Sequence, residues 1–354
     1  MIKLNPSRCV RYFSKFSQCS GCEEICPTEA IECESGSLKL FVDKCIGCGG
    51  CVGVCPTEAL ELGGFDVLEF AFEFLKSDEN AISCKKNFVC LAGLNVEYLI
   101  SFGLVKDVVL DIGHCDECDI ASSCFEKIEQ NVAEANYVLE NIGGKKVEAR
   151  KLGLVKESEP NRREFFNLFT LKGAIEAKEG FKEEMEALQN PQIALSSAQA
   201  QAIRQKDIPN RRKLLFTILK KVEKPQEYRY LENEHLSFIS DKEIEKSCDN
   251  CSICYRVCPT GALGSDRKFS KIEFDALLCI RCHLCHDVCE KESIKLSQYF
   301  DTQEFFEPKI KELITFDVKR CEDCGMWFSS FKGERLCLRC RAEEDAAKDL
   351  WGLK

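Results

Sequence analysis

The sequence lacks the long apolar segments and the phosphate-binding motifs that mark membrane proteins and nucleotide enzymes. No apolar run in the 354 residues approaches the ~18 residues of a membrane span, and no charged stretch followed by an apolar one opens the chain. It also has no G-x-G-x-x-G pattern after a strand, no P-loop and no paired-carboxylate motif. We therefore expect a cytoplasmic protein with no membrane span. We expect neither nucleotide-dependent catalysis nor acid–base catalysis by paired carboxylates.

The sequence also lacks an excess of positive charge. The chain has 49 Lys and Arg against 59 Asp and Glu, so its formal net charge is −10. This balance disfavours nonspecific binding of nucleic acid by the whole chain and favours solubility. Hydrophobic residues make up 45% of the sequence, which is enough for two or three domains with ordinary cores.

Cysteine, by contrast, is abundant and regularly spaced. Most of the 26 cysteines fall in CxxC patterns rather than in the scattered positions of a disulfide framework. In a reducing compartment such thiols are available to metals. The phrase CPTEA occurs at residues 26–30 and again at 55–59, and CPTGA occurs at 258–262, which indicates duplicated units.

The most complete pair of cysteine runs lies near the C-terminus. Its members are Cys248, Cys251, Cys254 and Cys258, followed by Cys279, Cys282, Cys285 and Cys289. With these runs, residues 240–297 resemble a bacterial-type ferredoxin domain that holds two [4Fe-4S] clusters, and residues 1–62 resemble a second one. In that family the first three cysteines of a run bind one cubane and the fourth binds the other.

The resemblance implies low-potential, one-electron transfer and two crossed ligand sets in the C-terminal unit. The implied sets are Cys248, Cys251, Cys254 with Cys289, and Cys279, Cys282, Cys285 with Cys258. Glu290 stands where the family has proline after the last cysteine. Extra negative charge beside a cluster favours its oxidised form, so we expect Glu290 to lower the potential of the first of these clusters.

The N-terminal unit is less regular. Its intact second run is Cys45, Cys48, Cys51 and Cys55, and Cys26 is the implied fourth ligand of the cluster held by the first three. The first run contains Cys19, Cys22 and Cys26, but Phe16 occupies the place of its first cysteine.

The cluster bound by Cys19, Cys22 and Cys55 therefore needs one more ligand. We expect Cys9, because a loop of nine intervening residues can return its thiolate to the site. Cys33 lies beyond Pro27, on a hairpin expected to lead away. The alternatives are a three-iron cluster or none.

Between the units, the hydrophobic period predicts alternating helices and strands. Helices are expected at 65–76, 95–103 and 122–141, with Gly143 as a C-cap, and strands at 81–84, 107–112 and 146–152. Such alternation favours a small α/β layer with parallel strands and right-handed crossovers.

Cysteines follow the ends of the predicted strands, where α/β folds place their sites. We expect a metal site formed by Cys84, Cys90, Cys115 and Cys118, with Cys124 or His114 as a substitute. The metal would be a fifth iron–sulfur cluster or zinc; simple burial or a dithiol redox pair are the alternatives. The segment loosely resembles the cysteine-bearing α/β iron–sulfur subunits that accompany hydrogenases and heterodisulfide reductases.

Residues 156–235 carry no cysteine and are locally basic, with 13 Lys and Arg against 8 Asp and Glu between 161 and 224. The pair Arg162 and Arg163 precedes a stretch too charged for an export signal. A helix is expected from Pro209 and Asn210. It is either a connector with a solvated charged face that packs against the ferredoxin units, or a docking arm for a partner subunit.

The C-terminal tail has two CxxC pairs separated by twelve residues, formed by Cys321, Cys324, Cys337 and Cys340. The pattern resembles a zinc ribbon, in which four thiolates bind a tetrahedral ion and stabilise a small unit. A rubredoxin-like single iron is the alternative. The mixed charge of the tail favours protein contact or a purely structural role over nucleic-acid recognition.

Together these observations predict an α+β protein. Two ferredoxin-like domains at 1–62 and 236–300 would flank an α/β domain at 63–155 and a helical basic connector at 156–235, with a zinc ribbon at 301–354. We expect an electron-transfer protein or subunit that uses four [4Fe-4S] clusters and a partner such as a hydrogenase or formate dehydrogenase. An oxidoreductase with its own site at the middle cysteines, or a redox-sensing or maturation protein, are the alternatives.

Overall fold

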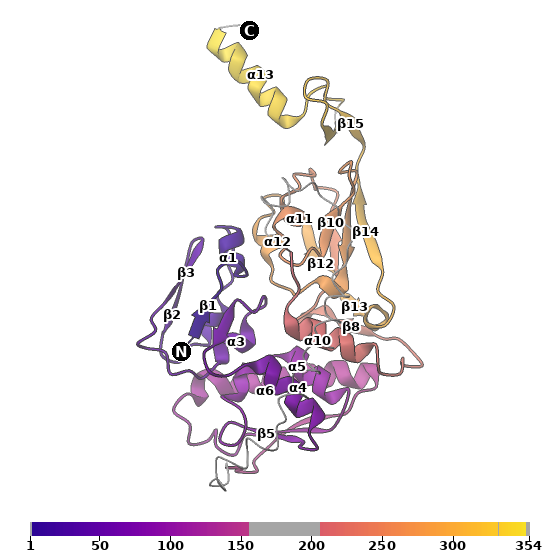
Figure 1. The fold of residues 1–354 in the computed structure, drawn as a ribbon. Coiled ribbons are helices and arrows are strands. Elements are labelled where there is room, and N and C mark those ends of the chain that lie inside the picture. Colours follow the sequence, from indigo (N-terminus) through magenta and orange to yellow (C-terminus); the bar gives the residue numbers. More distant parts are fainter. Residues whose placement is uncertain (1, 156–205, 332, 352–354) are drawn as a thin grey trace, which may run out of the picture.

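The structure is a computed structural model that describes residues 2–155, 206–331 and 333–351. Most of the expected basic connector, including Arg162 and Arg163, lies outside these residues. Figure 1 shows the N-terminal unit and the C-terminal unit standing side by side on the middle domain, with the tail extending beyond the C-terminal unit.

The two cysteine-rich units share one layout. In the N-terminal unit, β1 (Ile2–Leu4) pairs antiparallel with β4 (Leu60–Leu62), and the hairpin of β2 (Ile31–Glu34) and β3 (Ser37–Leu40) lies between them in the chain. Short helices α2 (Gly21–Glu24) and α3 (Gly50–Val54) lie within the two cysteine runs. Helix α1 (Val10–Phe13) is an addition near the start of this unit.

The C-terminal unit repeats this plan. Strand β9 (Lys242–Ile244) pairs with β12 (Ile294–Leu296), and β10 (Leu263–Ser265) forms a hairpin with β11 (Lys271–Asp275). Helices α11 (Ile253–Val257) and α12 (Leu284–Asp287) again lie within the two cysteine runs. Strand β14 (Ile310–Thr315) extends the hairpin to a three-stranded sheet, and β8 (Tyr230–Glu232) pairs with β13 (Tyr299–Asp301). The molecule is thus a mixed helix and strand protein.

The middle domain has the helices and strands that its periodicity predicts. Strands β5 (Ala81–Ser83), β6 (Val108–Asp111) and β7 (Val147–Arg150) form a parallel sheet in that order. The helices are α4 (Val67–Lys76), α5 (Val96–Gly103) and α6 (Ala121–Ile142). Asp66 and Asn95 cap α4 and α5 with their side chains, and Gly143 ends α6 with a φ of 81°. The predicted elements and their parallel order are confirmed.

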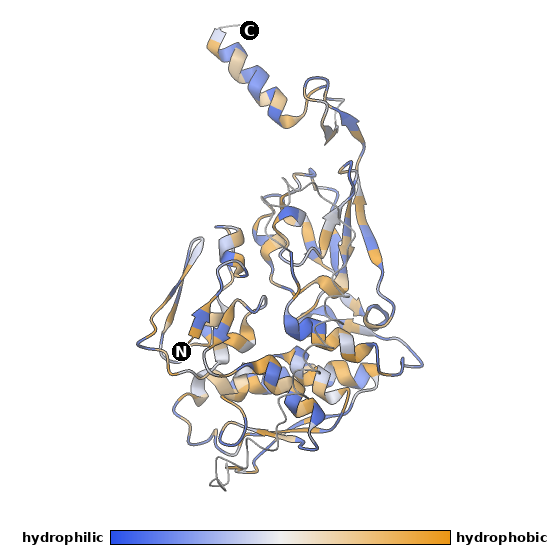
Figure 2. Ribbon diagram, in the orientation of Figure 1, coloured by the Kyte–Doolittle hydropathy of each residue, from blue (hydrophilic) through white to orange (hydrophobic). Residues whose placement is uncertain are grey.

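One hydrophobic core joins the middle domain, helix α10 (Asn210–Leu219) and the C-terminal unit. All residues of α5 are buried, and it packs against α10, whose Leu214 and Leu215 are also buried. Figure 2 shows apolar ribbon where these helices meet. Helix α10 begins at the predicted place, yet Arg211, Arg212 and Lys213 are buried. The expectation of a solvated charged face was wrong for this end of the helix.

The buried arginines of α10 are neutralised from within the core. Glu97 of α5 is buried and accepts hydrogen bonds from Nε of Arg211, at 2.8 Å, and from Nε of Arg212. A charged pair buried in this way needs such partners, because removal from water is costly. The hydrophobic periodicity of the sequence cannot identify this ion pair, because Glu97 lies 114 positions before Arg211 in the chain.

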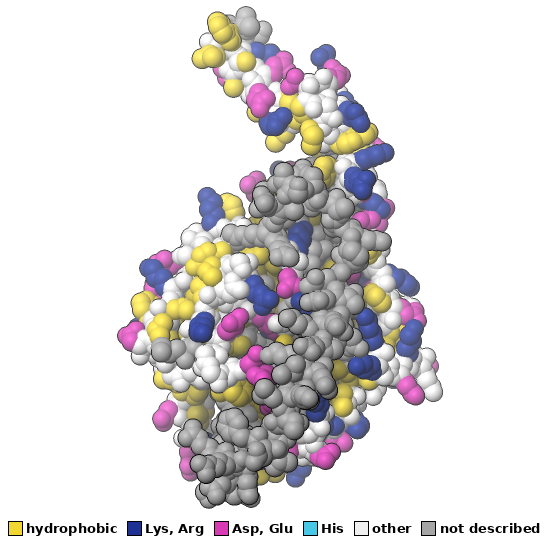
Figure 3. Space-filling model, in the orientation of Figure 1, with side chains coloured by type: hydrophobic (Ala, Val, Ile, Leu, Met, Phe, Trp, Pro, Cys, Tyr) yellow, Lys and Arg dark blue, Asp and Glu magenta, His cyan; other side chains and the backbone are white. Residues whose placement is uncertain are grey.

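The tail leaves the body of the molecule after β14. It consists of a hairpin of β15 (Val318–Arg320) and β16 (Trp327–Ser329) and of helix α13 (Leu338–Trp351), which projects away from the other domains (Figure 1). The hairpin touches the C-terminal unit through a hydrogen bond of 2.6 Å from Asn250 Nδ2 to Ser329 Oγ. On the face in view in Figure 3, basic and acidic side chains of the described residues are interspersed.

Candidate functional site: groups of cysteine thiols

The fourth cysteine of each run has the same local structure. The third residue after Cys26, Cys55, Cys258 and Cys289 has a positive φ, of 52°, 51°, 76° and 48° respectively. Glycine occupies this position only after Cys258, and glutamate occupies it in the other three. The sulfurs of Cys26, Cys55 and Cys289 accept the amide N–H four residues on, at 3.2 to 3.3 Å. The segment that begins at each of these three cysteines therefore forms a turn in which a backbone N–H donates to the thiol sulfur.

Three of the four cysteine runs also share a loop conformation. Positive φ angles recur two and four residues after the first cysteine, at Gly47 and Gly49, Asn250 and Ser252, and Arg281 and His283. Alternation of left- and right-handed residues turns successive backbone N–H groups toward one concave side, which suits an anionic cluster. In the first run Ser20 has a φ of −135°, so the loop that lacks its first cysteine also lacks this conformation.

In the C-terminal unit the thiols gather in two crossed groups. The first group, site C, consists of four cysteines that line one pocket: Cys248, Cys251, Cys254 and Cys289. Cys258 and Cys279 lie close enough to Cys282 and Cys285 for their charges to raise the pKa of both thiols. These four cysteines form a second group, site D. The structure thus brings together the residues that the resemblance groups as ligands.

In the N-terminal unit the regular group is site B, formed by Cys26, Cys45, Cys48 and Cys51. All four line one pocket, together with Ile2, Ile31 and Leu62. Burial among apolar residues raises the pKa of Cys51 to about 12, as it does for Cys285 in site D. Such thiols become thiolates readily only beside a strong positive charge, which a bound metal supplies.

Site A is the irregular group and contains five thiols. The charges of Cys55, Cys9 and Cys33 all act on Cys19, whose pKa is raised to about 12 chiefly by burial. Cys22 shares a side-chain hydrogen bond with Cys33. Cys9 therefore lies where the missing ligand was expected. The hairpin that carries Cys33 was expected to lead away from the site, yet Cys33 of β2 contacts Cys22, so this expectation was wrong.

Sites A and D face each other across the contact between the two units. Val10 of α1 packs against Leu284 and Val288, and both Cys19 of site A and Cys282 of site D border this small apolar cluster. The backbone N–H of Gln18 also donates to the Asp287 carboxylate at 2.9 Å. The irregular first loop of the chain is therefore the part of the N-terminal unit that meets its partner unit.

The two buried arginines of α10 reach the same pair of sites. Arg211 Nη2 donates to the carbonyl of Cys55 at 2.7 Å, and Arg212 Nη1 donates to the carbonyl of Cys279 at 3.1 Å. Each guanidinium thus lies beside one cysteine of site A or site D. Sequence reasoning missed this role, since a run of basic residues on a helix usually indicates a solvated face.

The middle-domain cysteines also come together. The charges of Cys84, Cys90 and Cys118 all act on Cys115, whose pKa is raised to about 11 chiefly by burial. His114, the expected substitute ligand, is engaged elsewhere, because its Nε2 lies 2.9 Å from the carbonyl oxygen of Leu154. Cys124 is buried and shares side-chain hydrogen bonds with Cys48 of site B and with Cys90.

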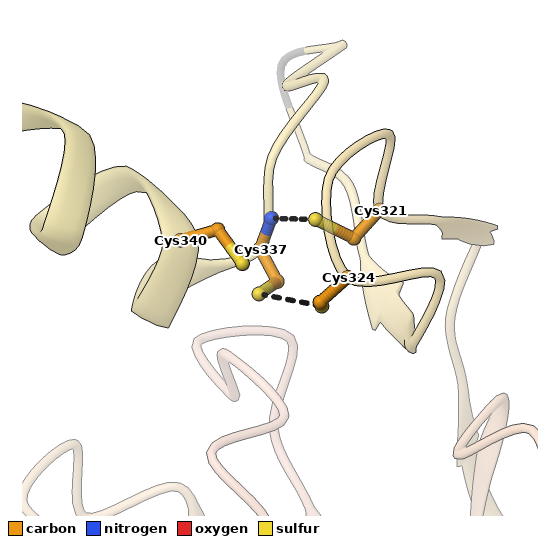
Figure 4. Close-up of side chains that lie close together, drawn as sticks. All are labelled: Cys321, Cys324, Cys337 and Cys340. Atoms are coloured by element: carbon orange, nitrogen blue, oxygen red, sulfur yellow. Dashed lines mark hydrogen bonds between the residues drawn. The ribbon is translucent and has the colours of Figure 1, made fainter.

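In the tail, the four cysteines form a tight group (Figure 4). The sulfurs of Cys321, Cys324, Cys337 and Cys340 all lie within 4.8 Å of one another. Cys324 and Cys337 are 3.8 Å apart, the separation of two ligands at ~2.3 Å from one tetrahedral ion. Burial acts to raise the pKa of Cys321, yet the backbone amides of Cys337, Cys324 and Asp323 lower it to about 6. The group suits a single metal ion.

Two segments of the chain match families of iron–sulfur domains. Residues 16–63 match the family model of the LdpA Fe-S cluster-binding domain, and residues 247–294 match that of the 4Fe-4S dicluster domain. Ferredoxin-type protein NapH of Haemophilus influenzae is 37% identical over 70 residues, which cover 18% of this chain and 24% of that protein. The match thus spans about a quarter of that relative's length.

The chain therefore contains ferredoxin-like domains of the kind that bind 4Fe-4S clusters. Among the described residues, none of the helices has both the length and the apolar character needed to span a membrane.

Proposed function

We propose that the chain relays single electrons along four [4Fe-4S] clusters, to or from a partner oxidoreductase such as a hydrogenase or formate dehydrogenase. The observation that carries this proposal is the gathering of the ferredoxin cysteines into four groups, two of which face each other across the contact between the units. The order of the relay is site B, site A, site D and site C, in either direction.

The ligand sets are part of the proposal. Sites B, C and D each contain the four crossed cysteines that a cubane needs. At site A the ligands are Cys9, Cys19, Cys22 and Cys55. Cys22 and Cys33 do not both bind, because the four thiolates of a cubane bind different irons and are held farther apart than two thiols that share a hydrogen bond. We assign the ligand to Cys22, because it has the same CxxC spacing from Cys19 as the cysteines of the other runs.

The surroundings of sites A and D favour reduction there. Arg211 and Arg212 place buried positive charge beside these two sites, with Glu97 as their shared counter-ion. Positive charge stabilises the more negative, reduced cluster, so it raises the potential. The inner pair of clusters would then accept electrons more readily than the outer pair, which suits a relay that exchanges electrons at its ends.

The test is a redox titration of the anaerobically prepared full chain, followed by electron paramagnetic resonance. The proposal predicts four low-potential centres, with magnetic interaction between neighbours. Replacement of Cys55 by serine should remove the signal of site A and slow electron passage between the two units. The control is Thr57→Ser, which keeps the hydroxyl beside the Cys55 sulfur. Passage at the unchanged rate in Cys55→Ser would rule out the proposed order.

We also propose that the tail binds one zinc ion through its four cysteines. The sulfur separations support a single ion, and zinc suits a small unit with little core of its own. Metal analysis of the full chain should find about one zinc, which Cys324→Ser removes while the iron content stays unchanged. Iron in place of zinc would favour the rubredoxin-like alternative.

A further inference from the structure

The loops after the parallel strands of the middle domain bring thiols to one edge of the sheet. Strands β5 and β6 are paired in register, with Ser83 opposite Asp111. Cys84 follows β5 directly, and Cys115 lies in the loop after β6. Because parallel strands end at the same edge, both cysteines belong to one side of the sheet.

The same edge is held rigidly by the segment after β7. The Asp111 carboxylate accepts the backbone N–H groups of Gly113, Leu152, Gly153 and Leu154 at 2.6 to 3.0 Å. Ser83 Oγ donates to the carbonyl of Leu154 at 3.1 Å. These bonds fix both cysteine loops relative to each other. A site prepared in this way does not depend on a flexible loop closing over it.

Two further cysteines complete the group. Cys90 precedes the short helix at Leu91–Gly93, and Cys118 lies in the turn before α6, where its N–H donates to the carbonyl of Cys115 at 3.2 Å. The charges of Cys90 and Cys118 both act on Cys84 and on Cys115. Cys118 is exposed, whereas the other three are partly buried. The group therefore lies at the surface of the domain.

The distances between these sulfurs distinguish an iron–sulfur cluster from a single metal ion. In the described part of the chain, the tail cysteines form a group with all sulfurs within 4.8 Å, and the middle-domain cysteines form no such group. A tetrahedral zinc would hold four sulfurs about 3.8 Å apart, given Zn–S bonds of ~2.3 Å. A cubane binds each thiolate through a different iron and so holds them farther apart. The wider arrangement suits an iron–sulfur cluster.

The middle domain and site B are packed tightly together. A Cβ atom on Gly53 of α3 would lie 2.2 Å from the carbonyl oxygen of Ala92, so only glycine allows this approach. Asn95 Nδ2 donates to the carbonyl of Gly53 at 2.8 Å, and the N–H of Cys90 donates to the carbonyl of Cys48 at 3.2 Å. Between them lies the Cys124 thiol, which shares hydrogen bonds with the sulfurs of both Cys48 and Cys90.

We propose that Cys84, Cys90, Cys115 and Cys118 hold a fifth iron–sulfur cluster, which exchanges electrons with site B through the contact made by Cys48, Cys124 and Cys90. The step is a single electron transfer: one centre is oxidised as the other is reduced, and no covalent bond forms or breaks. The inference rests on the proposed relay and extends it to the surface of the middle domain. Cys124 is a positioning residue: its single S–H proton is shared with the sulfurs of Cys48 and Cys90, and it binds no iron.

The experiment counts iron and acid-labile sulfide in the anaerobically prepared full chain and in Cys118→Ser, which changes an exposed side chain and spares the core. The full chain should contain about twenty irons, and the variant about four fewer, with the signals of the ferredoxin units unchanged. Ser122→Ala, an exposed change in the first turn of α6, which follows the turn that carries Cys118, is the control and should lose none.

A second variant tests the connection. In Cys124→Ala the iron content should stay at the level of the full chain, while the magnetic interaction between the fifth cluster and site B weakens. A full chain with about sixteen irons, or one with zinc at these cysteines, would overturn the fifth cluster and leave the four-cluster relay intact. A marked shortage of iron in the ferredoxin units themselves would instead refute the relay.

Discussion

The C-terminal unit contains two complete cysteine runs, whereas the N-terminal unit lacks one ligand of its first run and gathers five thiols at site A. The two units also differ in the parts of the molecule that they contact. The regular unit carries the tail beside site C, and the irregular unit meets the middle domain at site B and its sister unit at site A. The regular parts of the cysteine pattern form the pockets, and the irregular loop makes the contact between the units.

The sharpest way to test this comparison is to remove one crossing cysteine from each unit. Cys55→Ser and Cys258→Ser should each lose about four irons, because each crossing cysteine binds one cubane. Cys55→Ser should interrupt passage between site B and site D, and Cys258→Ser between site A and site C. Iron analysis and electron paramagnetic resonance give the result. Loss of all iron in one unit from a single change would show that its two clusters are not independent.

The second prediction concerns the feature that sets the N-terminal unit apart. Cys9→Ser should lose the cluster of site A, or convert it to a three-iron form, because it removes a ligand. Cys33→Ala should keep all the irons and shift only the potential of site A, since it removes the thiol that shares a hydrogen bond with Cys22. The reverse outcome would make Cys33 the ligand.

The third prediction compares the two arginines of α10. Arg212→Met should lower the potential of site D, and Arg211→Met that of site A, because each removes a buried cation near its site. Each change also breaks a buried ion pair with Glu97, so we expect a loss of about 3–5 kcal/mol in the free energy of unfolding. Redox titration separates the two effects: equal shifts of all clusters in both variants would indicate general disruption instead.

The smallest effect is expected at Glu290, which follows the fourth cysteine of its run at a position where the other three runs have proline. Glu290→Gln should raise the potential of site C, because it removes a negative charge from the lining of that pocket. Glu290 is exposed, so solvent and salt screen its charge and the shift should shrink as ionic strength rises. A redox titration at two salt concentrations measures this. A downward shift would contradict the electrostatic account.

Much of this fold is readable from the sequence, because its signals are local. The predicted helices and strands of the middle domain, including the cap at Asn95 and the end at Gly143, follow from hydrophobic period and turn residues. The crossed cysteine groups follow from a repeated motif. Both kinds of signal span a few residues of the chain.

The features that were missed depend on distant partners. Glu97 lies far in sequence from Arg211 and Arg212, and nothing in the basic run indicates that it is buried. Cys33 and Cys124 stand outside the CxxC patterns, and the thiols they contact belong to other elements. One signal was present: Gly53 is glycine where the other three runs have Glu24, Arg256 and Asp287, which marks a close approach.

The most direct test of the four crossed clusters is the iron and sulfide content of the full chain carrying Cys115→Ser and Cys118→Ser, prepared without oxygen. These changes remove the proposed fifth site and leave the ferredoxin units untouched. We expect about sixteen irons and as many sulfides, all bound by the two units. A content of about eight or fewer would contradict it, because at least two of the four cysteine groups would then hold no cluster.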